Sequence, residues 1–322
     1  MGLTLVHVSC ASDSSDTPFT PSDPLGDTLI VLPDTQFYTC AFADVFEQQT
    51  RWIADVRAQR HISLVLHTGD IVDSDLDPQW RVALESMSEL AGEVPYLVTT
   101  GNHDLRAGRA SLIQSYFPTS LLFSFDFESD TYEGGRIDNT YAIVRLAGRE
   151  WLVLGLEFGP RNRVVEWADH ILSAHPELPA IVFTHAYLFS DGQRYDRAYA
   201  PLQPFHPDLY QLTPEQGIND GQDLWTKLVS KHDNVRLVLS GHVIPDGTAH
   251  SSVTRASGSV VHQVLANYQL CDACPCAQVE GGGGFLRILT FSADAIRIET
   301  YSPYSQEWLR DPDNEFVLSP LL

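Results

Sequence analysis

The stretch of sequence that decides the fold is residues 63–73, Ser-Leu-Val-Leu-His-Thr-Gly-Asp-Ile-Val-Asp. Its apolar half, which ends in a glycine turn, predicts a buried β-strand that presents Asp70 and Asp73 at its carboxyl end. A second apolar run, 94–100, leads into Gly-Asn-His-Asp at residues 101–104. Functional groups of α/β proteins gather at the carboxyl ends of strands, so the two segments together predict a polar site.

The composition narrows the class of protein. The chain has 322 residues, of which 43% are hydrophobic and 19% charged, so we expect one large or two ordinary domains with a full core. Lysine and arginine number 20 against 42 aspartates and glutamates, a net charge of −22. This charge argues against binding to a nucleic-acid backbone and against adhesion to an anionic membrane. No apolar run reaches the ~18 residues that a membrane-spanning helix needs.

Strands and helices alternate along the chain and give way to a run of strands. The predicted strands are 28–32, 63–67, 94–100, 141–146, 151–156, 180–184, 235–240, 259–266, 285–291 and 295–301. The predicted helices are 44–59, 80–90, 164–174 and 223–231. Residues 189–221 are predicted to form a long functional loop. This order predicts an α/β fold in which a central two-sheet β-sandwich is flanked by helices, in one domain over residues 28–322.

The amino-terminal segment 1–27 reads as a tether rich in Ser, Thr, Asp and Pro. Apolar residues before Cys10 and the polar stretch after it resemble the end of a bacterial lipoprotein signal, which would make Cys10 a lipid anchor on an exported, periplasmic or cell-surface protein. The apolar region is short and no basic residue precedes it. A disordered terminus with an incidental cysteine is the alternative.

The other four cysteines fit an exported protein with two disulfides, because disulfides persist in oxidising compartments. A metal knuckle at 271–276 is the alternative, although a structural zinc site needs a fourth ligand from elsewhere. A cysteine-based redox protein is disfavoured because no strand and helix flank the Cys-x-x-Cys pair. The disulfide candidates are Cys40, Cys271, Cys274 and Cys276.

Polar side chains follow five predicted strands. Singly, each has an ordinary explanation as a turn or cap residue, but together they predict one site at a common edge. They are Asp34 and Gln36, Asp70 and Asp73, Asn102, His103 and Asp104, His185, and His242.

In these motifs the chain resembles the calcineurin-like metallophosphoesterase superfamily. That family carries Asp-x-His, Gly-Asp-x-x-Asp, Gly-Asn-His-Asp/Glu, an isolated His and Gly-His-x-His, and the resemblance covers residues 28–302. It implies a four-layer fold and a site for one or two divalent transition metal ions, Mn, Fe or Zn. By this resemblance Asp70 bridges two metals. The other ligands it implies are Asn102, His185 and His242 on one metal, and Asp34 and Gln36 on the other.

Two departures from the family pattern affect ligand positions of the same metal. Gln36 stands where the family has histidine, and Ile244 replaces the last histidine of Gly-His-x-His. An amide oxygen is a weaker ligand than imidazole for transition metals, and isoleucine offers none. Asp-Thr-Gln in the first motif resembles a bacterial subgroup of the superfamily. His262 is either a replacement ligand or an ordinary strand histidine.

The resemblance implies hydrolysis of a phosphomonoester or phosphodiester by attack of a metal-bound hydroxide. His103 would be the general acid, and Asp73 would orient its imidazole. Asp104 would either position His103 or cap a turn. Arg194 and Tyr195 are candidates for the substrate wall, unless that loop is held by its own salt bridges.

A non-catalytic module is the alternative reading. It would bind a phosphate or another ligand at a degenerate one-metal site. The absence of the family histidines at positions 36 and 244 favours this alternative. The enzyme is favoured by six site residues that match the family: Asp70, Asp73, Asn102, His103, His185 and His242. A site used only for binding has no need of His103.

Overall fold

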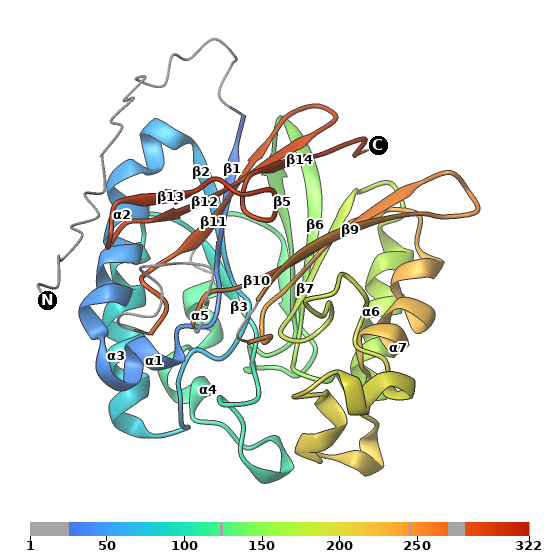
Figure 1. Ribbon diagram of the computed structural model, residues 1–322, viewed down its shortest axis with the longest axis horizontal. Helices are drawn as coiled ribbons and strands as arrows, with labels where there is room; N and C mark the ends of the chain where they lie inside the picture. Colours follow the sequence, from blue (N-terminus) through green and yellow to red (C-terminus); the bar gives the residue numbers. More distant parts are fainter. Residues whose placement is uncertain (1–25, 123–124, 245–246, 270–280, 322) are drawn as a thin grey trace, which may run out of the picture.

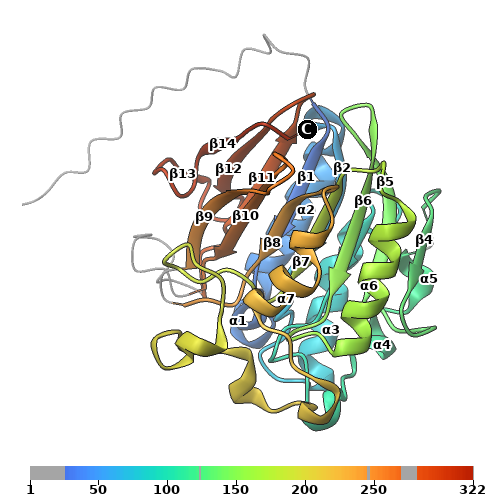
Figure 2. The ribbon, with the colours of Figure 1, turned by 90° about the vertical axis from the view of Figure 1, so that its right-hand side faces the viewer.

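Two seven-stranded mixed β-sheets pack face to face, and helices cover their outer faces (Figures 1 and 2). The computed structural model describes residues 26–122, 125–244, 247–269 and 281–321. Helices α1–α3 lie on the side of the first sheet, and α6 and α7 lie on the side of the second. The predicted two-sheet sandwich flanked by helices is therefore confirmed.

The first sheet has the order β13-β12-β11-β1-β2-β3, with β14 paired to β12. Its strands are β1 Thr28–Leu32, β2 Ile62–His67, β3 Tyr96–Val98, β11 Leu286–Phe291, β12 Ile296–Ser302, β13 Glu307–Leu309 and β14 Phe316–Leu318. β1 is buried along its whole length and pairs in parallel with β2, with Leu32 opposite His67. Strands β1, β2 and β3 run the same way, so the segments that follow them leave at one edge.

The second sheet has the order β4-β5-β6-β7-β8-β10-β9. Its strands are β4 Ser129–Thr131, β5 Thr140–Leu146, β6 Arg149–Leu156, β7 Ala180–Thr184, β8 Val235–Ser240, β9 Gly247–Thr254 and β10 Val260–Asn267. β6, β7, β8 and β10 are parallel to one another. Their carboxyl ends therefore also share one edge, where His185 follows β7 and His242 follows β8.

The helices bury apolar faces against the sheets. They are α1 Gln36–Ala41, α2 Ala43–Arg60, α3 Asp77–Met87, α4 Ile113–Tyr116, α5 Thr119–Leu122, α6 Asn162–Ala174 and α7 Gly221–Lys227. On α6 the buried residues Val164, Val165, Ala168 and Leu172 recur at helical spacing and form the stripe that packs on the sheet. Among the described helices, none is long and apolar enough to cross a membrane.

The structure differs from the sequence-based elements mainly in short pieces. It adds α1, α4, α5, β4, β9, β13 and β14, and it shortens the strand predicted at 94–100 to β3. β9 is an edge strand that pairs only with β10, and several of its polar side chains are exposed, so it lacks the apolar signature of a buried strand. Residues 1–25, Cys10, Cys271, Cys274 and Cys276 lie outside the described residues.

The two sheets contact each other through large apolar side chains. Trp151 of β6 and Phe291 of β11 are both buried, and their rings meet edge to face with centroids 5.2 Å apart. Aromatic pairs of this geometry contribute beyond the area they bury. This contact helps to hold the two sheets together at the end of the sandwich opposite the carboxyl ends of the parallel strands.

Replacing Trp151 with alanine should therefore lower the free energy of unfolding by about 3–5 kcal/mol, because the cavity lies between the sheets. Chemical denaturation measures this change. Val317→Ala is the control, since Val317 is 58% exposed and its truncation should change the stability by less than about 0.5 kcal/mol. Equal effects of the two substitutions would contradict the packing role of Trp151.

Candidate metal centre

The segments that follow five strands meet at one edge of the sandwich. They follow β1, β2 and β3 of the first sheet and β7 and β8 of the second. At their centre, Asp70, His185 and His242 are buried and bring ligand atoms within 4.8 Å of one another. His185 Nε2 lies 3.1 Å from Asp70 Oδ2 and 3.0 Å from His242 Nδ1. The structure thus brings together residues that are far apart in the sequence.

Backbone carbonyls set the orientation of both imidazoles. His185 Nδ1 lies 3.0 Å from the Thr68 carbonyl oxygen, and His242 Nε2 lies 2.7 Å from the Phe205 carbonyl oxygen. A carbonyl can only accept, so each of these nitrogens carries a proton. The other nitrogens, His185 Nε2 and His242 Nδ1, then point toward each other and toward the Asp70 carboxylate. Histidines that bind metals are usually held in this way.

The electrostatics of the centre favour a positive charge. Burial lowers the pKa of His185, but the carboxylates of Asp70 and Asp34 outweigh burial and raise it to about 9. Burial raises the pKa of Asp70, but the His185 imidazole overcomes this and holds that pKa below its usual range. Burial and the neighbouring His185 lower the pKa of His242 to about 3. Buried carboxylates of this kind are stabilised by a cation.

Two of the predicted ligands have buried amide oxygens without a hydrogen-bond partner. Asn102 Oδ1 and Gln36 Oε1 accept no hydrogen bond from any described residue. Buried acceptors without partners are rare in folded proteins and call for an explanation such as an ion. Asp70, His185 and His242 thus form a candidate metal site. The motif resemblance adds Asn102 as an oxygen donor to the same ion, and oxygen together with imidazole is a donor set that suits transition metals.

Asp34 provides a carboxylate for a second site. It accepts hydrogen bonds from the His242 backbone N–H, at 3.2 and 3.3 Å, and from Asn267 Nδ2 at 2.8 Å. Burial raises the pKa of Asp34 to about 7, and repulsion from Asp70 adds to the shift against the opposing effect of His185. Ile244 is partly buried and has no donor atom. A second metal, which the motif resemblance implies, would have Asp34, Gln36 and the shared Asp70 as ligands, a weaker set than that of the first.

Close approach of the carboxylates requires glycine at two turns. A Cβ on Gly101 would lie 2.1 Å from Asp70 Oδ1, and a Cβ on Gly241 would lie 2.4 Å from Asp34 Oδ1. Asp70 itself has a φ of 49°, in the left-handed region that non-glycine residues adopt at some cost. The glycines of the sequence motifs are thus explained by the space that the carboxylates occupy.

His103 lies beside the centre with its ring partly exposed. Its backbone N–H donates to Asp70 Oδ1 at 2.9 Å, and its side chain is 38% exposed. Its Nδ1 lies 2.7 Å from the Asp73 backbone oxygen and 3.7 Å from the Asp73 carboxylate. Burial lowers the pKa of His103, but Asp70 and Asp73 outweigh it and raise the pKa. Asp73 thus holds the imidazole mainly through its main chain.

Asp104 joins the turns of the two sequence motifs. It is fully buried, and its carboxylate accepts from the N–H groups of Val72 at 3.0 Å and Gly101 at 2.8 Å. Burial and the neighbouring Asp70 raise its pKa to about 7. Two roles were considered for Asp104: positioning His103 or capping a turn. The structure shows the hydrogen bonds of a turn cap, and they hold the two turns.

Other candidate residues lie outside the metal cluster. Arg194 donates to Gln222 and Gln263 and lies over the Trp225 ring. Tyr195 packs its buried ring 5.8 Å from His242, but its hydroxyl donates to Pro204. His262 lies within β10 and contacts Ser252 and Pro320. Cys40 is exposed and forms no disulfide with another described residue.

Four further residues support the centre, and sequence reasoning missed three of them, Asn267, Arg109 and Phe205; for residues 157–161, which include Phe158, it left open a pocket wall or a hairpin exit. Asn267 ends β10, so the strand-end rule that found the other ligands would also have found it. Phe158 packs its ring 5.6 Å from His185 and 5.3 Å from His242. Buried Arg109 donates to the carbonyls of Phe158 and Gly159 and fixes that wall. Phe205 acts through its carbonyl, for which no residue type is a signal.

Comparisons with known proteins agree with this geometry. The model of the calcineurin-like phosphoesterase family matches residues 28–246. The chain is 30% identical over 299 residues to "Uncharacterized protein YvnB" of Bacillus subtilis (strain 168). This match covers 87% of the chain but 20% of the relative, so the chain spans about a fifth of that protein's length.

Comparison with solved structures finds similarity at low sequence identity. Purple acid phosphatase PPD1 from yellow lupin (Lupinus luteus) seeds has a TM-score of 0.54 and 16% identity, over 93% of this chain and 55% of that one. GAP50 of Plasmodium has a TM-score of 0.47 and 12% identity, over 93% of this chain and 90% of that one. At such identity the first likeness shows the fold alone.

Replacing Asp104 with alanine should destabilise the protein by about 1–3 kcal/mol for each buried N–H left unsatisfied, and two are involved. Metal affinity should fall too, because the turns that carry Asp70 and Asn102 separate. Denaturation of the metal-free protein and calorimetric metal titration measure the two effects. Asp104→Asn, which retains one acceptor oxygen, should lose less of both, and an unchanged alanine variant would refute the role.

Proposed function

Because the chain belongs to the calcineurin-like phosphoesterase family, we propose that it hydrolyses a phosphomonoester or phosphodiester with a divalent metal held by Asp70, Asn102, His185 and His242. Membership of the family confirms the resemblance drawn from the motifs. The observation that carries the proposal is the pair of imidazole nitrogens, 3.0 Å apart, that converge with the Asp70 carboxylate in a buried cluster.

The donor set supports a transition metal. Two imidazoles, a carboxylate and an amide oxygen suit Mn, Fe or Zn, whereas Mg and Ca prefer oxygen alone. A bound ion of this kind neutralises charge on a phosphoryl group and lowers the pKa of a water molecule. Asp34 and Gln36 are available to a second, more weakly held ion.

His103 is the residue that we propose gives a proton to the leaving group. Its ring borders the cluster and is partly exposed, and the Asp73 carbonyl holds Nδ1. Nε2 is then the nitrogen free to give a proton to the departing oxygen. The hydrogen bond from the His103 N–H to Asp70 keeps this acid beside the metal ligand.

The alternative function, ligand binding at a one-metal site, rests on a specific observation. Ile244 offers no ligand where the family supplies an imidazole, and Gln36 offers only an amide oxygen. Metal analysis combined with turnover of para-nitrophenyl phosphate and its bis ester separates the two functions. One metal per chain without turnover in Mn²⁺, Fe²⁺ or Zn²⁺ would favour binding.

We expect His103→Ala to lower kcat by about 10²–10⁴-fold on an alkyl phosphate, because an alkoxide must be protonated as it leaves. The loss should be smaller on para-nitrophenyl phosphate, whose leaving group needs no proton. Metal content should stay at the wild-type value, whereas His185→Ala should lose the metal. His170→Ala is the control on the exposed face of α6. Equal losses on the two substrates would rule out the role of acid.

Gln36→His should tighten the binding of a second metal ion, because imidazole is a better ligand than an amide for transition metals. The first ion should bind with unchanged affinity, since Gln36 is not among its ligands. Calorimetric titration of the metal-free protein resolves the two binding steps. A variant with wild-type affinity for the second ion would show that Gln36 does not face that site.

A further inference from the structure

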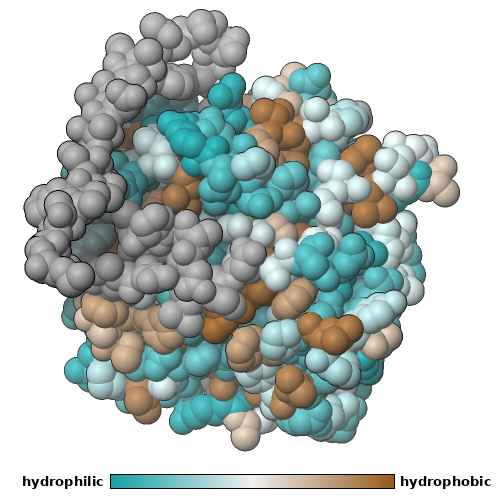
Figure 3. Space-filling model, in the orientation of Figure 1, coloured by the Kyte–Doolittle hydropathy of each residue, from teal (hydrophilic) through white to brown (hydrophobic). Residues whose placement is uncertain are grey.

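Exposed apolar side chains concentrate on one segment between β7 and β8. Tyr199, Leu202, Phe205 and Leu209, which we call the apolar platform, are 58%, 77%, 40% and 67% exposed. Among the described residues, the other large hydrophobic side chains this exposed are Leu76 and Val317 alone. In Figure 3, brown apolar residues interrupt the teal surface in the lower part of the molecule, where this segment lies in Figure 1. Such a cluster marks a surface that contacts something apolar.

The platform is continuous with the metal centre. The Phe205 carbonyl accepts the hydrogen bond from His242 Nε2, and the Phe205 ring lies edge-on to the His242 ring at 6.4 Å. Phe205 has a φ of 62°, in the left-handed region that a bulky residue rarely adopts. The ring of Tyr210 lies 6.0 Å from His242. The apolar surface therefore begins at a predicted metal ligand.

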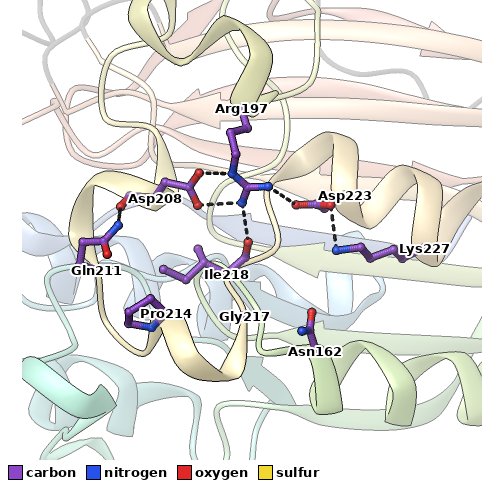
Figure 4. Close-up of a pocket in the computed structure, with 9 residues that line it drawn as sticks. All are labelled: Asn162, Arg197, Asp208, Gln211, Pro214, Gly217, Ile218, Asp223 and Lys227. Carbon is purple, nitrogen blue, oxygen red and sulfur yellow. Dashed lines mark hydrogen bonds and ion pairs between the residues drawn. The ribbon is translucent and has the colours of Figure 1, made fainter.

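The cations of residues 194–227 are already engaged. Arg197 pairs with Asp208 and Asp223, and Lys227 pairs with Asp223 at 2.8 Å (Figure 4). The guanidinium of Arg194 is held by two glutamine side chains and an indole ring. These are all the lysines and arginines of residues 194–227. A substrate with several phosphates would find no unengaged lysine or arginine within residues 194–227.

We propose that the apolar platform receives the hydrocarbon part of the substrate, so that the substrate is a phosphoester of an apolar alcohol. This inference rests on the proposed function. Water supplies the oxygen that joins phosphorus and the proton that the alcohol takes as its bond to phosphorus breaks. The occupant is a single amphiphilic molecule from solution, because a net charge of −22 opposes approach to an anionic bilayer.

The test compares n-alkyl phosphates from ethyl to octyl, each below its micelle concentration, with the Mn²⁺-loaded full chain. The value of kcat/KM should rise about three- to fourfold per added methylene until the chain outgrows the platform. Leu202→Ser combined with Leu209→Ser should remove this rise, and both positions are exposed enough to keep the fold intact. Val317→Ser, an exposed apolar position on β14 at the far end of the first sheet, should retain it.

A binding measurement separates failure of the platform from failure of the hydrolase. Calorimetry with n-alkylphosphonates, which cannot be hydrolysed, should show affinity that rises with chain length in the wild type and not in the double variant. Turnover without any chain-length dependence would overturn the platform and leave the hydrolase standing. Chain-length-dependent binding without turnover of any ester would support the platform and overturn the hydrolase.

Two further outcomes would assign the surface to another occupant. Co-sedimentation with phosphatidylcholine vesicles, lost in the double variant, would mean that the platform contacts a bilayer. A dimer in sedimentation analysis that the double variant dissociates would mean that it contacts a second copy of the chain. Either result, in place of the chain-length dependence, would overturn the inference.

Discussion

The arrangement of the centre depends on two hydrogen bonds from imidazole to backbone carbonyl. The Thr68 carbonyl holds His185, and the Phe205 carbonyl holds His242, so that the free nitrogens face each other beside Asp70. Two nitrogen lone pairs and a carboxylate repel one another at such distances unless a proton or a cation lies among them. The side chains of this cluster repel one another when no positive charge lies among them, and a positive charge at their centre stabilises the arrangement. This is the condition for a tight metal site.

Such a cluster has to be held in place by the rest of the structure. Glycines at 101 and 241 leave the space that the Asp70 and Asp34 carboxylates fill, and Asp104 joins the turns after β2 and β3. The candidate ligands come from both sheets: Asp34, Asp70 and Asn102 follow strands of the first, and the two histidines follow strands of the second. Packing between the sheets therefore sets the distance between carboxylates and imidazoles, so that stability of the sandwich and geometry of the site are coupled.

The sequence predicted the parts of this site that follow a local rule. Each ligand comes directly after an apolar run, and a strand end is recognisable without knowledge of the fold, which is why Asp70, Asn102 and His185 could be placed at one edge. Contacts made by the main chain could not be predicted, because the Phe205 carbonyl carries no signature of residue type. Proximity in sequence does not settle the role of Arg194, which follows His185 closely and whose guanidinium donates to Gln222 and Gln263. The edge strand β9 was missed because its exposed polar residues lack a strand's apolar pattern.

In the proposed function, the segment between β7 and β8 would link metal binding to recognition of the substrate. Its Phe205 presents the carbonyl that orients His242 and, on the same residue, a ring at the border of the apolar platform. A ligand that moves the backbone at Phe205 would change the direction in which the His242 nitrogen points, because the hydrogen bond transmits the movement. The left-handed φ of Phe205 makes this backbone position costly to keep, so contacts on both sides have to maintain it. If a metal binds at His242 and a substrate on the platform, the two sites would not be independent. The affinity of each site for its ligand should then depend on the occupation of the other.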